Sequence, residues 1–479
     1  MSDAFDRAER LLRRLACQTN LLIAGRPVSA TPAGHPVADA LLAIAKGLGA
    51  LPANAASPHA LAFDVHTGTA TLGGKPLPER PTADTRIDFA RAHMPVSRAI
   101  AAELAASGAV KGLRIGVAMT LEPKTASLAL MLRDAGADVA VYAHPDETDP
   151  AVAAALRARG IAVDADATLS GARERESALA YLARGFDIVA DDGSHLVRLA
   201  HESAPQLVAG WIGVTEETTS GLAPLRLMER EGVLATSVMA VNDAPTKTHF
   251  DNRYGTAQSC VFAIADLLER AGVTLRDQPA LVIGYGPVGQ GVASYLRALG
   301  VQVSVAEIDA VRALQALHDG FPVGAATGLA SGALVVSATG AASTITAALR
   351  DKAAAVAVAG GVPGELELDD VRATLIEVAP HVERLRQGTL VLDRGGCINV
   401  TAAEGNPIEI MDLSFATQLA AIGHLASTRP GRGVHLLPPH VVESVARAAT
   451  LAFGLDLASD VQEHTATASW HSTRYPREK

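Results

Sequence analysis

Lys247 and Asp251 are the two residues of this chain whose types and spacing most directly suggest chemistry, and His249 and Asn252 lie beside them. A lysine and a carboxylate at positions i and i+4 can share one face of a helix. On a protein surface such a pair stabilises a helix by under about 1 kcal/mol. Here, however, the pair precedes a long helical pattern that leads into a nucleotide-binding motif, so it is a candidate catalytic pair.

That motif is a glycine-rich turn formed by Gly284, Gly286 and Gly289. A short apolar run precedes it, a helical pattern follows it, and a second apolar strand at Val301–Ala306 ends at Glu307. This order of strand, G-x-G-x-x-G turn, helix, strand and acid is typical of a dinucleotide site, with the pyrophosphate at the helix N-terminus. Because a carboxylate accepts hydrogen bonds from the adenosine ribose and repels a 2′-phosphate, the sequence predicts NAD rather than NADP.

The composition limits the remaining possibilities. The chain has 479 residues, which predicts two or three domains, and it is 49% hydrophobic and 19% charged. A formal net charge of −10 without a basic block argues against binding to nucleic acid. No apolar run reaches the length of about 18 residues that a membrane span needs, and the N-terminus is polar and acidic. We therefore expect a cytoplasmic protein that binds no membrane.

The cysteines give no sign of a metal site or a disulfide. Cys17, Cys260 and Cys397 are far apart in the sequence and form no C-x-x-C motif. We expect all three to be buried small hydrophobic residues and expect no metal.

From residue 113 onward, apolar runs alternate with amphipathic stretches. Repeated β-α units predict parallel, doubly wound sheets that bind ligands at the carboxyl ends of their strands. The predicted fold class is therefore α/β, with two Rossmann-like parallel-sheet lobes and a hinge. Strands are expected at Leu113–Met119, Asp138–Tyr142, Ile161–Val163, Asp187–Ala190, Leu207–Gly213, Val233–Ala240, Ala333–Val336, Ala354–Ala359 and Thr389–Leu392, and helices at Lys124–Ala135, Pro150–Arg159, Ala172–Arg184 and Gly255–Ala271.

The two ends of the chain are less regular. Residues 1–83 contain helical patterns at Asp6–Ala16 and Pro36–Leu48 and a possible hairpin at Ala60–Leu77 that turns on Gly73-Gly74, and we expect an accessory or oligomerisation layer there. Residues 408–440 are mixed. The predicted division is an N-terminal extension at 1–83, a substrate-binding lobe at 84–243 and 405–440, an NAD-binding domain at 244–404, and a C-terminal helix and tail at 441–479 that could reach a neighbouring subunit.

Several segments resemble one enzyme family, and the resemblance runs from about residue 85 to the C-terminus, about four fifths of the chain. Ala190-Asp-Asp-Gly-Ser, Gly213–Gly221, Val241–Gly255, Gly284–Gly291 and Gly433–Pro438 carry the resemblance, as do shorter matches at Glu307-Ile-Asp and Met411–Phe415. The chain resembles S-adenosylhomocysteine hydrolase. That resemblance implies tightly held NAD that oxidises a ribose 3′-hydroxyl, loss of the acidified 4′ proton, elimination of the 5′ thiol, addition of water and reduction of the ketone.

The resemblance also implies roles for individual residues. Lys247 and Asp251 match the pair that deprotonates the 3′-hydroxyl, and Asp192 and Glu217 match carboxylates that hold the ribose and move protons. Positions expected to contact the cofactor are Gly284, Gly286, Val288, Gly289, Glu307, Thr218, Thr219, Ser220, Asn252, Asn399, Thr339 and Gly340. Positions expected to contact the substrate are Thr120, Glu122, Asn406 and Met411. The segment Arg474-Tyr475 vaguely resembles a tail that reaches a neighbouring subunit's NAD.

The chain departs from the family mainly on the substrate side. It has Ala118-Met119-Thr120 where the family has His-Met-Thr, and His144–Asp149 where the family has Ser-Thr-Gln-Asp-His. Ala359–Pro363 lacks another family histidine, and Gly405-Asn406-Pro407 replaces a Gly-His-Pro hinge. Arg312 replaces an asparagine near the adenosine ribose. Because an imidazole titrates near neutrality and the alanine and valine that replace the family's histidines do not, efficient hydrolysis of adenosylhomocysteine itself is not expected.

Three readings remain open. The first is a diverged enzyme that oxidises a ribose-like hydroxyl of a nucleoside or nucleoside thioether, with or without chemistry at C5′. The second is an ordinary adenosylhomocysteinase in which His93, His195 or His249 replaces the lost histidines, although each is more simply an ordinary surface or core histidine. The third is an NAD-binding regulator without turnover. The family forms homotetramers, so a homo-oligomer is expected.

Overall fold

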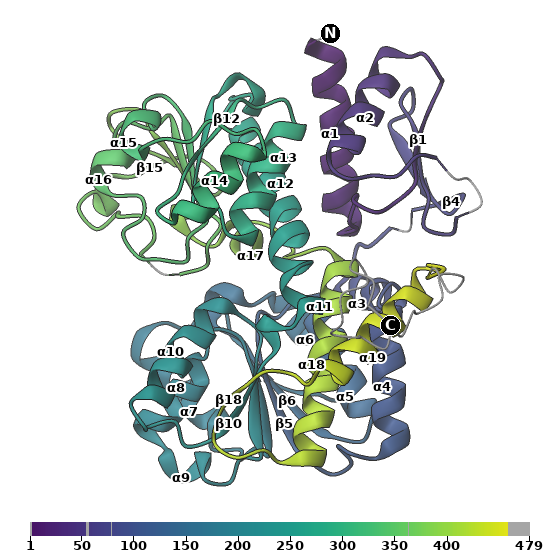
Figure 1. Ribbon diagram of the computed structural model, residues 1–479, viewed down its shortest axis with the longest axis vertical. Coiled ribbons are helices and arrows are strands. Elements are labelled where there is room, and N and C mark those ends of the chain that lie inside the picture. Colours follow the sequence, from purple (N-terminus) through teal and green to yellow (C-terminus); the bar gives the residue numbers. More distant parts are fainter. Residues whose placement is uncertain (1, 54–56, 78, 363, 458–479) are drawn as a thin grey trace, which may run out of the picture.

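The structure is a computed structural model that describes residues 2–53, 57–77, 79–362 and 364–457. Two seven-stranded sheets form two lobes, and a smaller sheet forms a third layer at the N-terminal end (Figure 1). The predicted α/β class with two Rossmann-like lobes is confirmed. The segment Arg474-Tyr475 lies outside the described residues.

The first lobe contains a fully parallel sheet with strand order β18-β10-β9-β8-β5-β6-β7. Most of its central strands are buried along their whole length, which explains why they read as continuous apolar runs rather than alternating ones. Its strands are β5 (Arg114–Ala118), β6 (Asp138–Tyr142), β7 (Ala162–Asp164), β8 (Ile188–Asp191), β9 (Gly213–Glu216), β10 (Ser237–Ala240) and β18 (Gly433–His435).

Helices cover both faces of this sheet (Figure 1). One face packs against α3 (Ala83–Ala92), α4 (Pro95–Ser107), α5 (Pro123–Asp134), α6 (Pro150–Ala158), α18 (Ile408–Thr428) and α19 (Pro439–Ala452). The other face packs against α7 (Gly171–Leu182), α8 (His195–Ser203), α9 (Pro205–Val208) and α10 (Thr219–Arg230).

The second lobe contains a sheet with strand order β12-β11-β13-β14-β17-β16-β15. The first five strands are parallel, and β15 and β16 form an antiparallel edge that the sequence analysis did not predict. The strands are β11 (Ala280–Ile283), β12 (Val303–Ala306), β13 (Leu334–Ser337), β14 (Ala355–Val358), β15 (Ile376–Ala379), β16 (Val382–Arg384) and β17 (Leu390–Leu392). Its helices are α12 (Thr256–Arg270), α13 (Pro287–Ala298), α14 (Ala310–His318), α15 (Ala326–Leu329), α16 (Ala347–Arg350) and α17 (Ile398–Thr401).

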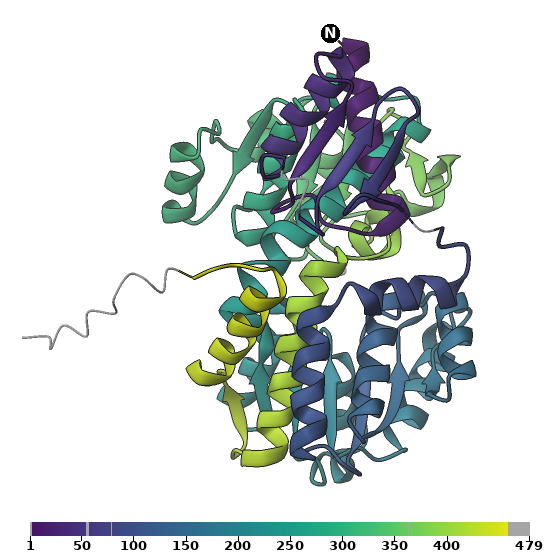
Figure 2. The ribbon, with the colours of Figure 1, turned by 90° about the vertical axis from the view of Figure 1, so that its right-hand side faces the viewer.

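The N-terminal residues form a layer that packs on the second lobe (Figure 2). Helices α1 (Ser2–Thr19) and α2 (Pro36–Gly47) lie beside a sheet of β1 (Val28–Thr31), β2 (Leu61–Asp64), β3 (Thr69–Leu72) and β4 (Lys75–Pro76). Apolar side chains of this layer share one core with α12 and α13. Residues 2–77, where described, are therefore part of the same packed unit as the second lobe.

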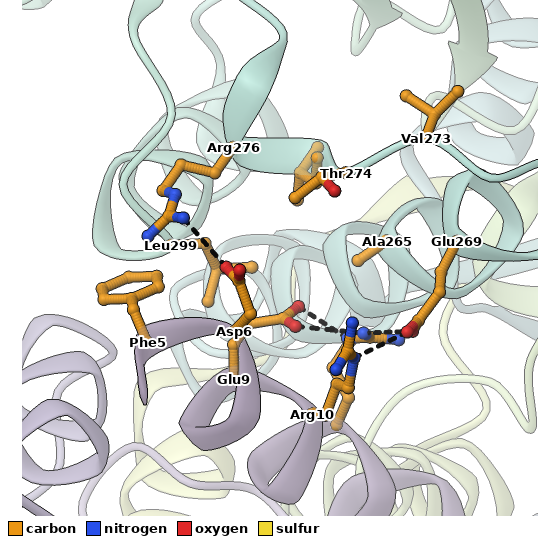
Figure 3. A pocket seen from close by; sticks show the side chains of 12 residues that line it. Phe5, Asp6, Glu9, Arg10, Ala265, Glu269, Val273, Thr274, Arg276 and Leu299 are labelled. Carbon is orange, nitrogen blue, oxygen red and sulfur yellow. Dashed lines mark hydrogen bonds and ion pairs between the residues drawn. The ribbon is translucent and has the colours of Figure 1, made fainter. Parts of the chain in front are cut away.

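Ion pairs border the contact between α1 and α12 (Figure 3). The buried guanidinium of Arg13 pairs with Glu9, Asp266 and Glu269, and Arg10 pairs with Glu269 at 2.6 Å. The cavity between them measures about 40 Å³, which is far too small for a nucleotide. This contact is a seam between two packed elements and not a ligand site.

Four expectations differ from the structure. Leu207–Gly213 is not a strand, because 205–208 form the short helix α9 and the strand begins only at Gly213. The hairpin at 60–77 has a second turn between β2 and β3, in addition to the one at Gly73-Gly74. Residues 408–428 form one continuous helix, whose all-round burial hid its periodicity. Of the three cysteines expected to be buried, only Cys260 is; Cys17 is exposed and Cys397 is half-buried.

Two further observations concern the described part of the chain as a whole. None of its helices combines the length and apolar character that crossing a bilayer requires. Within the same residues, no cluster of three or more His, Cys, Asp or Glu side chains has an arrangement that could hold a metal ion.

Candidate functional site

Lys247 and Asp251 form a buried ion pair at the junction of the two lobes. After β10 the chain passes through η2 (Val241–Asp243), α11 (Pro245–Thr248) and the π-helical turn η3 (Asp251–Gly255) before entering α12. Lys247 Nζ lies 2.7 Å from Asp251 Oδ2, and the two side chains are only 3% and 9% exposed. This low exposure excludes the alternative that Lys247 and Asp251 form an ordinary salt bridge on the surface of a helix.

Two amides complete the surroundings of the ammonium group. Lys247 Nζ donates to Asn252 Oδ1 at 3.0 Å and to Asn242 Oδ1 at 3.4 Å. Burial by itself would lower the pKa of Lys247, but the carboxylates of Asp251 and Glu217 outweigh it and the pKa is raised. Lys247 is therefore a charged hydrogen-bond donor across the physiological pH range.

Glu217 is a buried carboxyl group that lies beside the Gln418 amide, which lowers the pKa of Glu217. Both of its oxygens lack a hydrogen bond among the described residues, as do both polar atoms of the Gln418 amide. Burial raises the pKa of Glu217 to about 8, with Asp251 and Asp192 adding to the rise and Lys247 opposing it. A buried polar group in this condition is costly unless something else satisfies it, so Glu217 points to a bound ligand.

Glu216, next to Glu217, has a structural role. Its carboxylate accepts hydrogen bonds from the backbone of Gly193 and Ser194, each at 3.0 Å, and from Thr218 Oγ1 at 2.7 Å. These contacts tie the turn after β8 to the turn after β9. The neighbouring carboxyl groups of Asp192 and Glu217 are thereby held at the same edge of the sheet.

Asp192 is half-buried. The charges of Lys247 and Asp251 act on it, and it has a hydrogen bond with the Thr218 side chain. Burial raises its pKa, Lys247 lowers it and Asp251 raises it further. The adjacent Asp191 accepts from the Val197 N–H at 3.1 Å, and burial raises its pKa to about 7. Asp192 faces the Lys247 group, whereas Asp191 anchors α8.

Glu147 is a member of this acidic group that the sequence analysis did not single out. It ends the short turn η1 (Pro145–Glu147), whose backbone is tied to the loop after β5 by the Leu121 N–H donating to Glu147 O at 2.9 Å. Burial, with the charges of Asp192 and Asp146, raises the pKa of Glu147 to about 8, while a hydrogen bond with Thr120 lowers it. Glu147 lies in the segment His144–Asp149. The one feature of the sequence that could have drawn attention to Glu147 is that this segment replaces a family motif.

The glycine turn forms a cradle of the kind a dinucleotide needs. Gly284 has φ +94°, and a Cβ there would lie 2.9 Å from Ala338 O. A Cβ on Gly289 would lie 1.9 Å from Gly284 O, so α13 can approach the strand this closely only with glycine. A Cβ on Gly286 would meet only the Arg312 guanidinium, at 3.7 Å, which leaves this side of the turn open.

Glu307 follows β12 and faces the same turn. Its carboxylate accepts from the Tyr285 N–H at 2.6 Å and from the Ile308 and Asp309 N–H groups at 2.7 and 2.9 Å. The acid is thus fixed beside the glycine turn, in the place where a ribose diol would bind. These residues fit NAD as the bound group.

The Lys247 pair and the cradle are adjacent because η3 packs against α13. A Cβ on Gly291, inside α13, would lie 2.0 Å from Arg253 O of η3. A Cβ on Gly255 would lie 2.7 Å from the Ile410 side chain of α18. Glycines at both positions let α13, the turn η3 that contains Asp251, and the first lobe come together.

Comparisons with known proteins agree with this geometry. Residues 252–405 match the model of the S-adenosyl-L-homocysteine hydrolase NAD-binding domain. The adenosylhomocysteinase of Thermococcus kodakarensis is 34% identical over 402 residues, which cover 80% of this chain and 94% of that protein. The chain belongs to the adenosylhomocysteinase family. The adenosylhomocysteinase of Archaeoglobus fulgidus is 35% identical over 79% of this chain and 96% of that protein.

Another relative is named for a different substrate. The S-inosyl-L-homocysteine hydrolase of Methanopyrus kandleri is 35% identical over 399 residues, covering 79% of this chain and 92% of that protein. Relatives at the same level of identity therefore differ in the base of their substrate. This chain is an NAD-binding member of a family of hydrolases.

Several residues that were predicted to contact a ligand form hydrogen bonds or an ion pair within this adenosylhomocysteinase-family chain. Thr218 caps α10, Thr219 Oγ1 donates to Asn242 Oδ1 at 3.2 Å, and Ser220 Oγ donates to Thr218 Oγ1 at 3.3 Å. Glu122 caps α5 and pairs with Lys124 at 2.7 Å. Ligand roles for these four remain predictions.

The other predicted positions lie around the junction or the cradle. Asn399 Nδ2 donates to Asn406 Oδ1 at 3.0 Å, and Asn406 Nδ2 donates to Asp251 Oδ1 at 2.5 Å. Met411 is half-buried against the core of the first lobe. Val288 packs on the core of the second lobe, and Thr339 and Gly340 are exposed after β13.

The three candidate replacement histidines lie in ordinary settings. His93 Nδ1 is 2.8 Å from Phe89 O, within its own helix end, and His249 is exposed. The ring of His195 is 5.0 Å from that of His144, and burial together with the positive charges of His144 and Arg198 lowers the pKa of His195 to about 4. Among the described residues, the groups with pKa values moved toward neutrality at this site are carboxyls.

Proposed function

We propose that this chain uses bound NAD to oxidise the ribose 3′-hydroxyl of a nucleoside or nucleoside thioether whose recognised end differs from that of S-adenosylhomocysteine. The observation that carries the proposal is the buried Lys247–Asp251 pair next to the glycine cradle, together with the buried Glu217 carboxyl, whose oxygens meet no hydrogen-bond geometry within the described residues. Perturbed ionisable groups that gather at a junction of lobes are typical of a catalytic site.

Lys247 and Asp251 would act at the 3′-oxygen. The Lys247 ammonium donates a hydrogen bond to this oxygen and stabilises the alkoxide that oxidation requires, and the Asp251 carboxylate beside it accepts the hydroxyl proton. NAD, when bound, supplies the two-electron oxidation and later returns the electrons. Both residues are buried, so water does not weaken these interactions.

Asp192 and Glu217 would act on the 4′ C–H proton and on a ribose oxygen. A 3′-ketone makes the 4′ C–H acidic, and a carboxylate beside it can then accept that proton. With its pKa raised to about 8, Glu217 is largely protonated at neutral pH and can donate a hydrogen bond to a ribose oxygen. Asp192 is half-buried, and the Lys247 ammonium favours its ionised form, so Asp192 would be the base that accepts the 4′ proton.

The substrate remains within the nucleoside class. The segments His144–Asp149, Ala359–Pro363 and Gly405-Asn406-Pro407 replace family motifs for which the resemblance implies substrate contacts. The relative from Methanopyrus kandleri, by its name, acts on the inosine thioether, which supports a changed base for this chain as well. Two other candidates are an adenosylhomocysteinase of ordinary specificity and a regulator that binds NAD without turnover.

One experiment separates these candidates. The NAD-loaded protein is mixed with adenosine, inosine, S-adenosylhomocysteine and S-inosylhomocysteine, and both NADH absorbance and thiol release are followed. We expect reduction by at least one nucleoside and weak thiol release from S-adenosylhomocysteine. Rapid thiol release from S-adenosylhomocysteine would favour the ordinary enzyme, and no reduction with any nucleoside would refute the proposal and leave the regulator.

A further inference from the structure

The chain crosses between its two lobes three times. The first crossing is the segment around 79–82, which leads from the N-terminal layer on the second lobe to α3 of the first (Figure 2). The second is 241–255 and contains Lys247 and Asp251, and the third is 402–407, between α17 and α18. The two lobes are connected directly by the second and third crossings, and the N-terminal layer provides a third covalent connection between them.

The first and third crossings are tied together through Glu404. Arg80 donates to Glu404 Oε1 at 2.6 Å and to the carbonyl of Gln18 at the end of α1 at 2.8 Å. The Arg80 side chain is 5% exposed, and its guanidinium also lies 5.1 Å from the ring of Phe89 in α3. One arginine thus joins the N-terminal layer, the third crossing and the first lobe.

Asn20, at the end of α1, holds the backbone of the third crossing on both sides of Gly405. Asn20 Nδ2 donates to Glu404 O at 3.0 Å and to Asn406 O at 3.4 Å, and the Ile408 N–H donates to Asn20 O at 2.9 Å. The first lobe holds the same segment through Arg86 and Lys124, which donate to Glu404 Oε2 at 3.0 Å and Glu404 O at 2.8 Å.

The third crossing ends in a direct contact with the catalytic pair. Asn406 Nδ2 donates to Asp251 Oδ1 at 2.5 Å and to Thr256 Oγ1 at 3.2 Å, and Asn406 Oδ1 accepts from Asn399 at 3.0 Å. The other oxygen of Asp251 is the one that pairs with Lys247. The position of the third crossing is thereby coupled to the position of the Asp251 carboxylate.

We propose that the N-terminal layer braces the third crossing and that Asn406, as a positioning residue, passes this constraint to Asp251. The layer thus keeps the Lys247–Asp251 pair in the geometry of the closed junction. The part of this inference that concerns Asp251 rests on the proposed function. The brace itself is a property of the fold and can be measured without any substrate.

The first test measures the brace by amide hydrogen exchange. Asn20→Ala and Arg80→Gln should increase exchange at residues 404–409 by about tenfold or more, because each loses hydrogen bonds that hold this segment. Arg10→Gln is the matched control, since Arg10 lies on the same layer in a half-exposed ion pair with Glu269 away from the crossing. Unchanged exchange at 404–409 in both test variants would refute the brace.

The second test measures the coupling to Asp251 by a double-mutant cycle. Asn406→Ala should lower the rate of NAD reduction by a bound nucleoside about 10- to 100-fold, with NAD retention unchanged. In an Asp251→Asn background the same change should cost less than about twofold, because the group through which Asn406 acts is already lost. Equal losses in both backgrounds would refute the positioning role.

The outcomes distinguish this inference from the proposed function. If the wild-type protein reduces NAD normally and Asn406→Ala does the same, only the positioning role is wrong. If the wild-type protein reduces no NAD with any nucleoside, the proposed function and the Asp251 part of the inference are wrong together. The exchange experiment still decides the brace in either case.

Discussion

Replacement of Lys247 by methionine is the most direct probe of the buried ion pair. Methionine keeps the aliphatic length of the side chain and removes only the charge. In the wild-type protein the ammonium lies 2.7 Å from Asp251 and lowers the pKa values of Asp192 and Glu217. Without it, three carboxyl groups share one poorly solvated region with no opposite charge from Lys247.

The structure gives the size and the pH dependence of the effect. Breaking a buried pair by removing one partner costs about 3–5 kcal/mol. Carboxyl groups whose pKa is raised on folding stabilise the protein at low pH, and that contribution is lost as the pH rises through the raised pKa. Since Lys247→Met raises the pKa values of Asp192 and Glu217 further, its stability loss should be largest near pH 8 and smaller near pH 5.5.

The assay is urea unfolding at both pH values, together with NAD reduction. Lys111→Met, at an exposed position, is the matched control and should change neither quantity. The double variant Lys247→Met/Asp251→Leu should recover much of the stability but none of the reduction, because an apolar pair no longer leaves a buried charge. A loss below about 1 kcal/mol for Lys247→Met at pH 8 would show that the pair is not buried as described.

Three further changes test other parts of the site. Glu217→Gln should raise the urea midpoint at pH 8 more than at pH 5, since it removes a carboxyl with a pKa of about 8; an equal change at both pH values would contradict that assignment. Gly289→Ala should abolish NAD retention, because its Cβ would lie 1.9 Å from Gly284 O, whereas Gly328→Ala, with open space around it, should retain NAD after gel filtration. Glu307→Gln should weaken NAD binding about tenfold and lower the ratio of the affinities for NAD and NADP, as measured by titration with each cofactor. An unchanged ratio would show that Glu307 does not bind the ribose.

The sequence could predict those parts of the site that depend on local pattern. Gly289 is required by a steric contact with Gly284 O inside the motif, Gly284 has φ +94° in the turn itself, and Glu307 follows from the length of one helix and one strand. The i, i+4 spacing of Lys247 and Asp251 predicted their pairing, and the structure shows the pair. Each of these relations lies within one supersecondary unit, so the sequence alone contains them.

The sequence could not predict relations that depend on burial or on distant segments. Glu216 and Glu217 are adjacent and identical in type. The Glu216 carboxylate accepts hydrogen bonds from three backbone N–H groups and one hydroxyl, whereas the oxygens of Glu217 meet no hydrogen-bond geometry among the described residues. Glu147 belongs to the acidic group only because β6 and β8 end at the same edge of the sheet. The helix at 408–428 was hidden because it is buried nearly all round.

By itself the sequence determined the α/β class, the family resemblance and the candidate chemistry at Lys247, Asp251 and the glycine turn, because these depend on residue types and short spacings. Only the tertiary structure decided that residues 2–77 belong to the packed unit of the second lobe and that Asn20, Arg80 and Asn406 connect that layer to Asp251. The contacts join positions up to 386 residues apart, and no local pattern encodes such a distance. Their existence depends on the packing of whole lobes.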